Sequence, residues 1–92
     1  MEKYFKIIAT DCYIRNNGKI LMLYRNKREN NKRFYRGVGG KVEQGESPIE
    51  CVKREVREEA GVEINPIWRG IVTFSKPSSQ DWEAHIFTAE GF

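Results

Sequence analysis

Three glutamates in the middle of the chain have the residue type and spacing of a metal site. Glu58 and Glu59 follow Glu55 at three and four residues, so on an α-helix all three lie within an arc of roughly 100°. Like charges at these spacings destabilise a helix by roughly 0.2–0.5 kcal/mol per pair, and a divalent cation between them would turn the repulsion into attraction. Carboxylate oxygens suit Mg²⁺ or Mn²⁺. The segment also holds three basic residues, so a solvated face neutralised by surface ion pairs is the alternative interpretation.

Residues 47–61 carry the signals of a complete helix that would position these glutamates. Ser47 is the expected N-cap, Pro48 suits the first helical position, and Glu50 completes a capping box. Gly61 is the expected left-handed cap that ends the helix. Apolar residues at spacings of three and four predict one face that packs on a core, namely Ile49, Val52, Val56 and Ala60.

Strands are expected on both sides of this helix. Runs rich in β-branched and aromatic residues predict four of them, over residues 4–14, 20–24, 67–75 and 82–88. Asn17 and Gly18 form a strong hairpin signal between the first two strands, because both residues tolerate positive φ. Loops or turns are expected in the polar residues 26–33, the glycine-rich residues 37–40 and Pro-Ser-Ser at 77–79. These elements place the chain in the α/β class.

The composition fits one soluble globular domain over residues 1–92. Hydrophobic residues make up 39% of the chain and charged residues 32%, which is not the composition of a disordered protein. No apolar run approaches the roughly 20 residues that span a bilayer, and the first ten residues lack the apolar stretch of a signal peptide. A cytoplasmic location without a membrane partner is therefore expected. Cys12 and Cys51 lack metal-site spacing and are expected to be reduced, packed thiols.

Charge is divided unevenly along the chain. Residues 1–36 hold ten Lys/Arg and three Asp/Glu, whereas residues 37–92 hold six Lys/Arg and ten Asp/Glu. The basic part suits an anionic partner such as a phosphate or a nucleic acid, and the acidic part suits a hard divalent cation. Six basic residues close together predict either a polyphosphate clamp or a solvated loop: Arg25, Lys27, Arg28, Lys32, Arg33 and Arg36.

Residues flanking the three glutamates complete a known motif. Gly40 is followed after five residues by Glu46 and, after seven more, by Arg-Glu-Val-Arg-Glu-Glu-Ala-Gly-Val at 54–62. This run satisfies every position of the Nudix box, over residues 40–62, and a chance match is expected in roughly one window in a billion. The chain therefore resembles the Nudix hydrolases. Residues 37–42 and 81–88 are similar to the MutT-like, nucleotide-pool-cleaning branch of that family.

The resemblance implies a Nudix-type α/β fold, in which a mixed β-sheet packs on the helix of the Nudix box. Members of the family are usually longer, with further C-terminal strands and a second helix on the opposite face of the sheet. Residues 1–92 are thus expected to be the N-terminal part of such a domain. We expect weak or no catalysis from this part alone, and self-association through an uncovered sheet edge or face.

The resemblance also implies a role for individual residues. The metal ligands would be Glu55, Glu58, Glu59 and the backbone carbonyl of Gly40. The catalytic residues would be Glu55, Arg54 and Glu58, with Glu55 as the candidate base that takes the proton of the attacking water. Arg54 would pair with a neighbouring carboxylate and fix its rotamer. Glu46 would orient the box through hydrogen bonds.

Substrate binding would involve Arg25, Arg36, Gly39 and Lys41. In members that bind oxidised guanine, an asparagine often stands where Arg36 precedes the glycine run. Arginine offers only hydrogen-bond donors, which argues against oxidised guanine as the base. Trp68 and Trp82 are expected to pack in the core or at its rim, with stacking on a nucleobase as the alternative. The single histidine, His85, is expected to have a structural role.

The implied activity is Mg²⁺-dependent cleavage of a phosphoanhydride bond in a nucleoside triphosphate or another nucleoside-diphosphate derivative, with nucleotide-pool sanitising of the MutT or 8-oxo-dGTP diphosphatase type as one form of it. Water would attack one phosphorus, and in the MutT-like branch the products are a nucleoside monophosphate and pyrophosphate. The expected partner is a small nucleotide and not a nucleic acid. Two other functions stay open, namely a nucleotide- or RNA-binding module without turnover and an inactive fragment that associates with another chain.

Overall fold

The computed structural model describes residues 5–27, 32–76 and 80–91. Within these ranges, the side chains of residues 5, 25–27, 32–35, 76 and 80 are not part of the description. The elements follow in the order β1 (Phe5–Asn16), β2 (Lys19–Leu21), β3 (Leu23–Lys27), β4 (Lys32–Arg36), α1 (Pro48–Ala60), β5 (Ile67–Lys76) and β6 (Gln80–Glu90).

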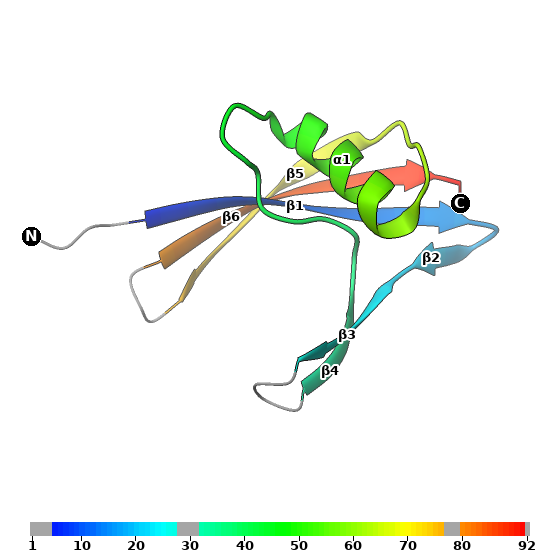
Figure 1. Ribbon diagram of the computed structural model, residues 1–92, viewed down its shortest axis with the longest axis horizontal. Coiled ribbons are helices and arrows are strands. Elements are labelled where there is room, and N and C mark those ends of the chain that lie inside the picture. The colour runs from blue at the N-terminus through cyan, green and yellow to red at the C-terminus, as the bar shows by residue number, and fades with distance from the viewer. Residues whose placement is uncertain (1–4, 28–31, 77–79, 92) are drawn as a thin grey trace, which may run out of the picture.

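Four of the strands form one mixed sheet in the order β2-β1-β6-β5. β1 runs parallel to β6 and antiparallel to β2, and β5 runs antiparallel to β6. β3 and β4 form a separate two-stranded sheet, which extends away from the first (Figure 1). The predicted mixed sheet with the helix of the Nudix box against it is confirmed.

The core lies between α1 and one face of the four-stranded sheet (Figure 1). Alternate residues of β1 and β6 point toward the helix, as the two-residue period of a strand requires. The buried apolar side chains are Cys12, Ile14, Val38, Cys51, Val52, Val56, Ile64, Phe87 and Ala89. Both cysteines are therefore packed thiols, as expected. One position of the predicted apolar stripe is wrong, since Ile49 is 45% exposed. Cys51 is buried instead, because the carbonyl oxygens of Gly40 and Lys41 cover the first turn of α1 at its thiol.

The local signals at the helix ends and at the first hairpin are confirmed. Glu50 N donates to the Ser47 hydroxyl (3.2 Å) and Ser47 N donates to the Glu50 carboxylate (2.9 Å), which is the predicted capping box. Gly61 ends α1 with φ 71°. Asn17 and Gly18 join β1 to β2 with φ of 51° and 76°. The strands predicted over 67–75 and 82–88 correspond to β5 and β6, whereas the turn predicted at 77–79 lies outside the described residues.

The region between the first hairpin and the glycines differs from its prediction. The strand expected over 20–24 is interrupted at Met22, where the chain leaves one sheet for the other. The loop expected over 26–33 is strand as far as Lys27 and again from Lys32, and residues 28–31 lie outside the described part. Polar side chains did not prevent pairing, because a ladder is made by backbone groups and β-propensity depends on context.

The predicted glycine turn at 37–40 is wrong, because this segment is extended and pairs with β1. Val38 and Cys12 exchange backbone hydrogen bonds of 2.7 and 3.0 Å, and Thr10 N donates to Gly40 O at 2.8 Å. Gly37, Gly39 and Gly40 do not have positive φ. They are needed for close approach, since a Cβ at Gly39 would overlap the Thr10 carbonyl.

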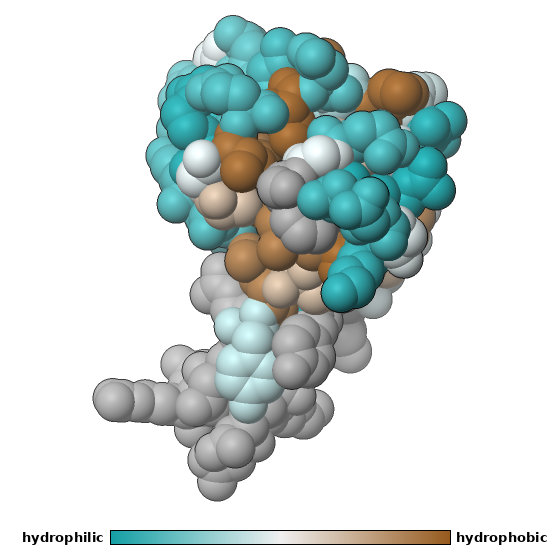
Figure 2. Space-filling model, turned by 90° about the vertical axis from the view of Figure 1, so that its right-hand side faces the viewer, coloured by the Kyte–Doolittle hydropathy of each residue, from teal (hydrophilic) through white to brown (hydrophobic). Residues whose placement is uncertain are grey.

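Several large apolar side chains stay exposed on the opposite face of the sheet. β5 and β6 pair Val72 with Ala84 and Phe74 with Trp82, positions that alternate with the buried Phe87 and Ala89 and therefore lie on the sheet face opposite the core. Val72 is 52% exposed and Phe74 44%. Figure 2 shows hydrophobic surface between hydrophilic areas on one side of the molecule. Among the described residues, no helix is long and apolar enough to cross a membrane.

Candidate active site

α1 and the extended glycine segment bring two of the three predicted glutamate ligands to one cavity. This cavity has a volume of about 600 Å³. It is lined by Ala9, Thr10, Asp11, Arg36, Gly39, Gly40, Lys41, Glu55, Glu59, Phe74, Trp82 and Ala84. The side chains of Glu55 and Glu59 are only 15% and 21% exposed. Glu58 does not line the cavity and is 58% exposed.

Arg54 ties the loop before α1 to the glutamates of the helix. Its Nε and Nη2 donate to both carboxylate oxygens of Glu46, at 2.7 and 3.1 Å. Its Nη1 donates to Glu55 at 2.9 Å and to Glu58 at 3.2 Å. These hydrogen bonds lower the pKa of the Glu46 carboxyl group to about 2, because they favour its charged form. Arg54 and Glu46 thus have contacts suited to the orienting roles predicted for them.

The carboxyl groups of Glu55 and Glu59 lie next to each other, and the described residues do not supply a hydrogen-bond donor to every one of their oxygen atoms. Burial raises the pKa of the Glu55 carboxyl group, hydrogen bonding to Arg54 lowers it, and the neighbouring Glu59 carboxyl raises it again. Oε2 of Glu59 is buried and has no hydrogen-bond partner among the described residues. A buried carboxylate oxygen without a donor is costly, and a hard cation would satisfy it. The donor set fits Mg²⁺ or Mn²⁺ in chemical type.

The three predicted carboxylate ligands are not gathered into one cluster. Across the described ranges, no group of three acidic, His or Cys side chains is close enough to hold a metal ion as it stands. Glu55 and Glu59 share the cavity, while Glu58 is turned to Arg54. A side chain 58% exposed can rotate to a new partner, so Glu58 as a ligand remains a prediction.

The backbone carbonyls beside the cavity have different partners. Gly40 O, the predicted carbonyl ligand, accepts from Thr10 N at 2.8 Å and from the Thr10 hydroxyl at 3.2 Å. It is therefore engaged in the pairing with β1. Gly39 O accepts from the Arg36 side chain at 3.1 Å. A Cβ at Gly40 would lie 2.7 Å from the Glu55 carboxyl group, so glycine keeps this space open beside Glu55.

Three of the four predicted substrate-binding residues line the cavity. They are Arg36, Gly39 and Lys41. The fourth, Arg25, belongs to β3, and its side chain lies outside the described part of the chain. Arg36 is held by two backbone carbonyls and by Glu59, which a sequence motif could not have indicated.

An aromatic wall and a carboxyl group in the cavity were missed from the sequence. Phe74 and Trp82 stack with ring centroids 5.8 Å apart and an interplanar angle of 8°, and Lys41 Nζ lies 5.6 Å from the centroid of the Trp82 ring. Asp11 accepts a 2.9 Å hydrogen bond from the Tyr13 hydroxyl, and burial raises the pKa of its carboxyl group. The usable signal for Asp11 was that it is the single carboxylate of β1.

Trp68 and His85 lie outside this cavity. Trp68 Nε1 donates to Nδ1 of His85 at 3.1 Å, and the other ring nitrogen of His85 lies 3.3 Å from Glu83. Glu83 also pairs with Lys6 at 3.3 Å. These contacts link β1, β6 and β5, in keeping with the structural role expected for His85.

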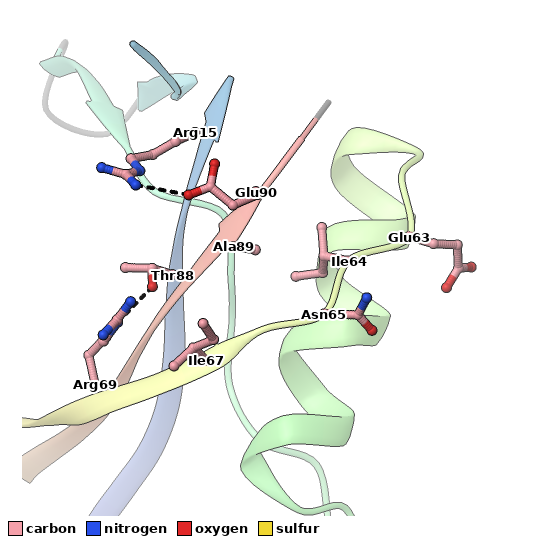
Figure 3. A pocket seen from close by; sticks show the side chains of 9 residues that line it. All are labelled: Arg15, Glu63, Ile64, Asn65, Ile67, Arg69, Thr88, Ala89 and Glu90. Atoms are coloured by element: carbon pink, nitrogen blue, oxygen red, sulfur yellow. Dashed lines mark hydrogen bonds and ion pairs between the residues drawn. The ribbon is translucent and has the colours of Figure 1, made fainter. Parts of the chain in front are cut away.

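A second cavity, of about 410 Å³, contains none of the predicted site residues. Figure 3 shows side chains of β5, of β6 and of the segment after α1 around it. Its two arginines are already engaged, Arg15 with Glu90 at 2.8 Å and Arg69 with the Thr88 hydroxyl at 2.8 Å (Figure 3). Of these two cavities, only the one beside α1 is lined by residues predicted for the site.

Comparison with known proteins gives the family of the chain. The NUDIX domain family model matches residues 6–91, so the chain belongs to the NUDIX domain family. It is 33% identical over 89 residues to the Nudix hydrolase YvcI of Bacillus subtilis, covering 91% of this chain and 54% of YvcI. It is 38% identical over 85 residues to the 8-oxo-dGDP phosphatase NUDT18 of Danio rerio, covering 86% of this chain and 25% of NUDT18.

Solved structures give the same result. The MutT protein from Methanosarcina mazei Go1 has a TM-score of 0.83 and 31% identity, covering 100% of this chain and 69% of that one. The E. coli ORF135 protein has a TM-score of 0.81 and 26% identity, and the match covers 94% of this chain and 61% of the ORF135 chain. The chain is therefore MutT-like in fold, and it spans about half or less of the length of the two curated relatives above.

Proposed function

We propose that the cavity beside α1 is the active site of a metal-dependent hydrolase that cleaves a phosphoanhydride bond in a nucleoside di- or triphosphate. The observation that carries the proposal is the buried pair of Glu55 and Glu59, with one carboxylate oxygen lacking a donor among the described residues. The pair lies in the same cavity as Lys41 and a stacked aromatic pair. The cavity thus combines carboxylates that can bind a cation, a lysine that can bind a phosphate and an aromatic surface that can stack on a base.

Glu59 and Glu55 would hold a Mg²⁺ or Mn²⁺ ion, with Glu58 joining them after release from Arg54. When bound, such an ion neutralises charge on the substrate phosphates and acidifies water. Arg54 keeps the Glu55 carboxylate in one orientation through the 2.9 Å hydrogen bond. Lys41, whose Nζ lies 5.6 Å from the centroid of the Trp82 ring, would attract the polyphosphate, and the Trp82 ring would stack on the nucleobase.

In the chemical step, the oxygen of a water molecule forms a bond to one phosphorus and the anhydride P–O bond breaks. The leaving phosphate oxygen takes the electron pair of that bond, and the water proton passes to a carboxylate. Glu55 is the proposed acceptor, since its carboxyl group lines the cavity and Arg54 holds it in one orientation.

The names of similar proteins support the nucleotide as substrate. NUDT18 is an 8-oxo-dGDP phosphatase, and several structural relatives are MutT proteins. Arg36 offers donors where a base-reading asparagine would offer donors and acceptors. We therefore expect an ordinary nucleobase to be preferred over an oxidised guanine. The stacked aromatic wall tolerates any base, because every base has a flat π-face.

The test is release of phosphate or pyrophosphate from a panel of nucleoside di- and triphosphates, with Mg²⁺ and with excess EDTA. Glu59→Gln should lower turnover at least about 100-fold. Glu63→Gln is the matched control, because Glu63 pairs with Arg57 on the surface and lies outside the cavity. Full turnover in EDTA, or in Glu59→Gln, would refute the proposal. Nucleotide binding without turnover would instead support one of the two alternatives, the binding module or the inactive fragment.

A further inference from the structure

The guanidinium group of Arg36 donates hydrogen bonds to three oxygen atoms next to Glu55 and Glu59. Its Nη1 donates to Gly37 O and to Gly39 O, both at 3.1 Å. Its Nη2 donates to Oε1 of Glu59 at 3.2 Å. The Arg36 and Glu59 side chains are 26% and 21% exposed, so their ion pair is partly shielded from water. These contacts use the planar, forked geometry that distinguishes arginine from lysine.

Two carbonyl oxygens and one carboxylate oxygen are also what a hard divalent cation prefers as ligands. The second oxygen of the same carboxylate, Glu59 Oε2, is buried and without a hydrogen-bond partner among the described residues. Arg36 therefore neutralises only part of Glu59 and leaves the rest beside Glu55. Two cations that need the same carboxylate compete for it.

We infer that Arg36 is a built-in counter-cation of the metal site, which a bound Mg²⁺ or Mn²⁺ displaces from Glu59 and which then serves the anionic substrate. The inference rests on the proposed function and concerns how its metal site is loaded. Before loading, Arg36 holds Glu59 and the Gly39 carbonyl in position and keeps the acidic pair from repelling. After loading, its guanidinium is free inside a cavity that it already lines.

The inference predicts that removal of the Arg36 side chain changes the affinity for metal and the affinity for pyrophosphate in opposite directions. Without Arg36 the metal has no competitor at Glu59, so it should bind more tightly. Without Arg36 the loaded site has lost a phosphate-binding group, so inorganic pyrophosphate should bind more weakly. A purely structural residue would shift both affinities in the same direction, because a disturbed site binds everything less well.

The experiment measures Mn²⁺ binding by calorimetry or electron paramagnetic resonance without nucleotide, and then pyrophosphate binding at saturating Mn²⁺. Arg36→Ala should bind Mn²⁺ about 2- to 5-fold more tightly than the unaltered chain, the upper part of the range for losing one partly exposed ion pair. Its pyrophosphate affinity should fall about 5-fold or more. Arg36→Lys keeps the charge but not the fork, so its Mn²⁺ affinity should lie between the two.

Arg57→Ala is the matched control for charge. Arg57 belongs to α1 but pairs with Glu63 at 2.9 Å, outside the cavity. It should change Mn²⁺ affinity less than about 2-fold. Equal tightening in Arg57→Ala and Arg36→Ala would mean that only net charge matters, and the inference would be overturned. Unchanged or weaker Mn²⁺ binding in Arg36→Ala would overturn it as well.

A separate variant reports on the proposed function. Glu59→Gln should weaken Mn²⁺ binding whether or not Arg36 is present. If Glu59→Gln leaves Mn²⁺ binding of the unaltered chain intact, the proposed metal site fails, together with the inference that rests on it. If Glu59→Gln weakens binding and Arg36→Ala does not strengthen it, the site stands and only the inference about Arg36 fails.

Discussion

Alanine at two neighbouring glycines should separate the stability of this domain from the function of its site. Gly39 and Gly40 both lie in the extended segment against β1. A Cβ at Gly39 would meet the backbone of Thr10, whereas a Cβ at Gly40 would meet the carboxyl group of Glu55. A backbone in a sheet cannot move without breaking its ladder, but a carboxylate can rotate. The two substitutions add the same methyl group and should have different effects.

For Gly39→Ala, relief of the overlap requires the segment to move away from β1. The bonds at risk are the pair between Val38 and Cys12 and the bond from Thr10 N to Gly40 O. At about 1 kcal/mol each, their loss destabilises the domain by roughly 2–4 kcal/mol. With a shift of about 4–8 °C per kcal/mol for a domain of this size, the melting temperature should fall by roughly 10–25 °C.

For Gly40→Ala, the added methyl group would lie 2.7 Å from the Glu55 carboxyl group, which must turn away from Arg54. One hydrogen bond to a charged group is lost, which costs about 1.5 kcal/mol at the lower end of its range because the freed carboxylate can turn to water, so the melting temperature should fall by about 6–12 °C. The carboxylate would be displaced by an ångström or so, and a displacement of that size lowers turnover about 100-fold.

Thermal unfolding by circular dichroism and product release should be measured on both variants and on the unaltered chain. The expected pattern is a larger loss of stability in Gly39→Ala and a smaller loss, with loss of activity, in Gly40→Ala. Equal losses of melting temperature in the two variants would refute the argument, because they would show that Glu55 is as rigidly placed as the sheet. Unaltered turnover in Gly40→Ala would show that the position of Glu55 does not matter for the reaction.

Three further predictions concern other parts of the molecule. Glu58→Gln should lower turnover by orders of magnitude in a kinetic assay if Glu58 leaves Arg54 for the metal, and an unchanged rate would show that it is not a ligand. Arg54 lowers the pKa of Glu46 from 4.5 to about 2, so the stability from this pair is present above pH 4.5 and lost as pH falls toward 2. In melting curves, Arg54→Met should lower stability near neutral pH and flatten this part of the pH dependence, and a profile parallel to that of the unaltered chain would contradict the assignment. Val72 is exposed and does not line the cavity, so it should promote self-association; sedimentation should show larger species that Val72→Lys reduces, and a monomer at all concentrations would exclude this.

Features governed by near neighbours in the chain were predictable from the sequence. α1 begins after Ser47 and ends before Gly61 as expected, because capping involves residues within one turn. The hairpin at Asn17 and Gly18 is local in the same sense. The position of Glu55 and Glu59 on one side of α1 follows from the helical period alone.

Features governed by contacts between distant residues were not predictable in this way. The glycines at 37–40 indicate a turn when read locally, yet their role is to let the segment approach β1 and α1. The stacking of Phe74 on Trp82 depends on the register between β5 and β6. The contact between Arg36 and Glu59 joins residues 23 positions apart on different elements. A motif predicts which residue types are present, and the fold decides which of them meet.

The parallel pairing of β1 with β6 has a consequence for how the chain acquires its structure. Every pair in this ladder joins residues 75 positions apart, from Phe5 with Gln80 to Arg15 with Glu90. The entropy cost of closing so long a loop comes before the contacts can stabilise the pair. This order of events slows folding in proteins of high contact order. During synthesis, β1 leaves the ribosome first but lacks its central neighbour until β6 has emerged. The edge of β1 that faces β6 therefore stays unpaired until β6 is available, whereas its other edge can pair earlier with β2 and the segment at 38–41.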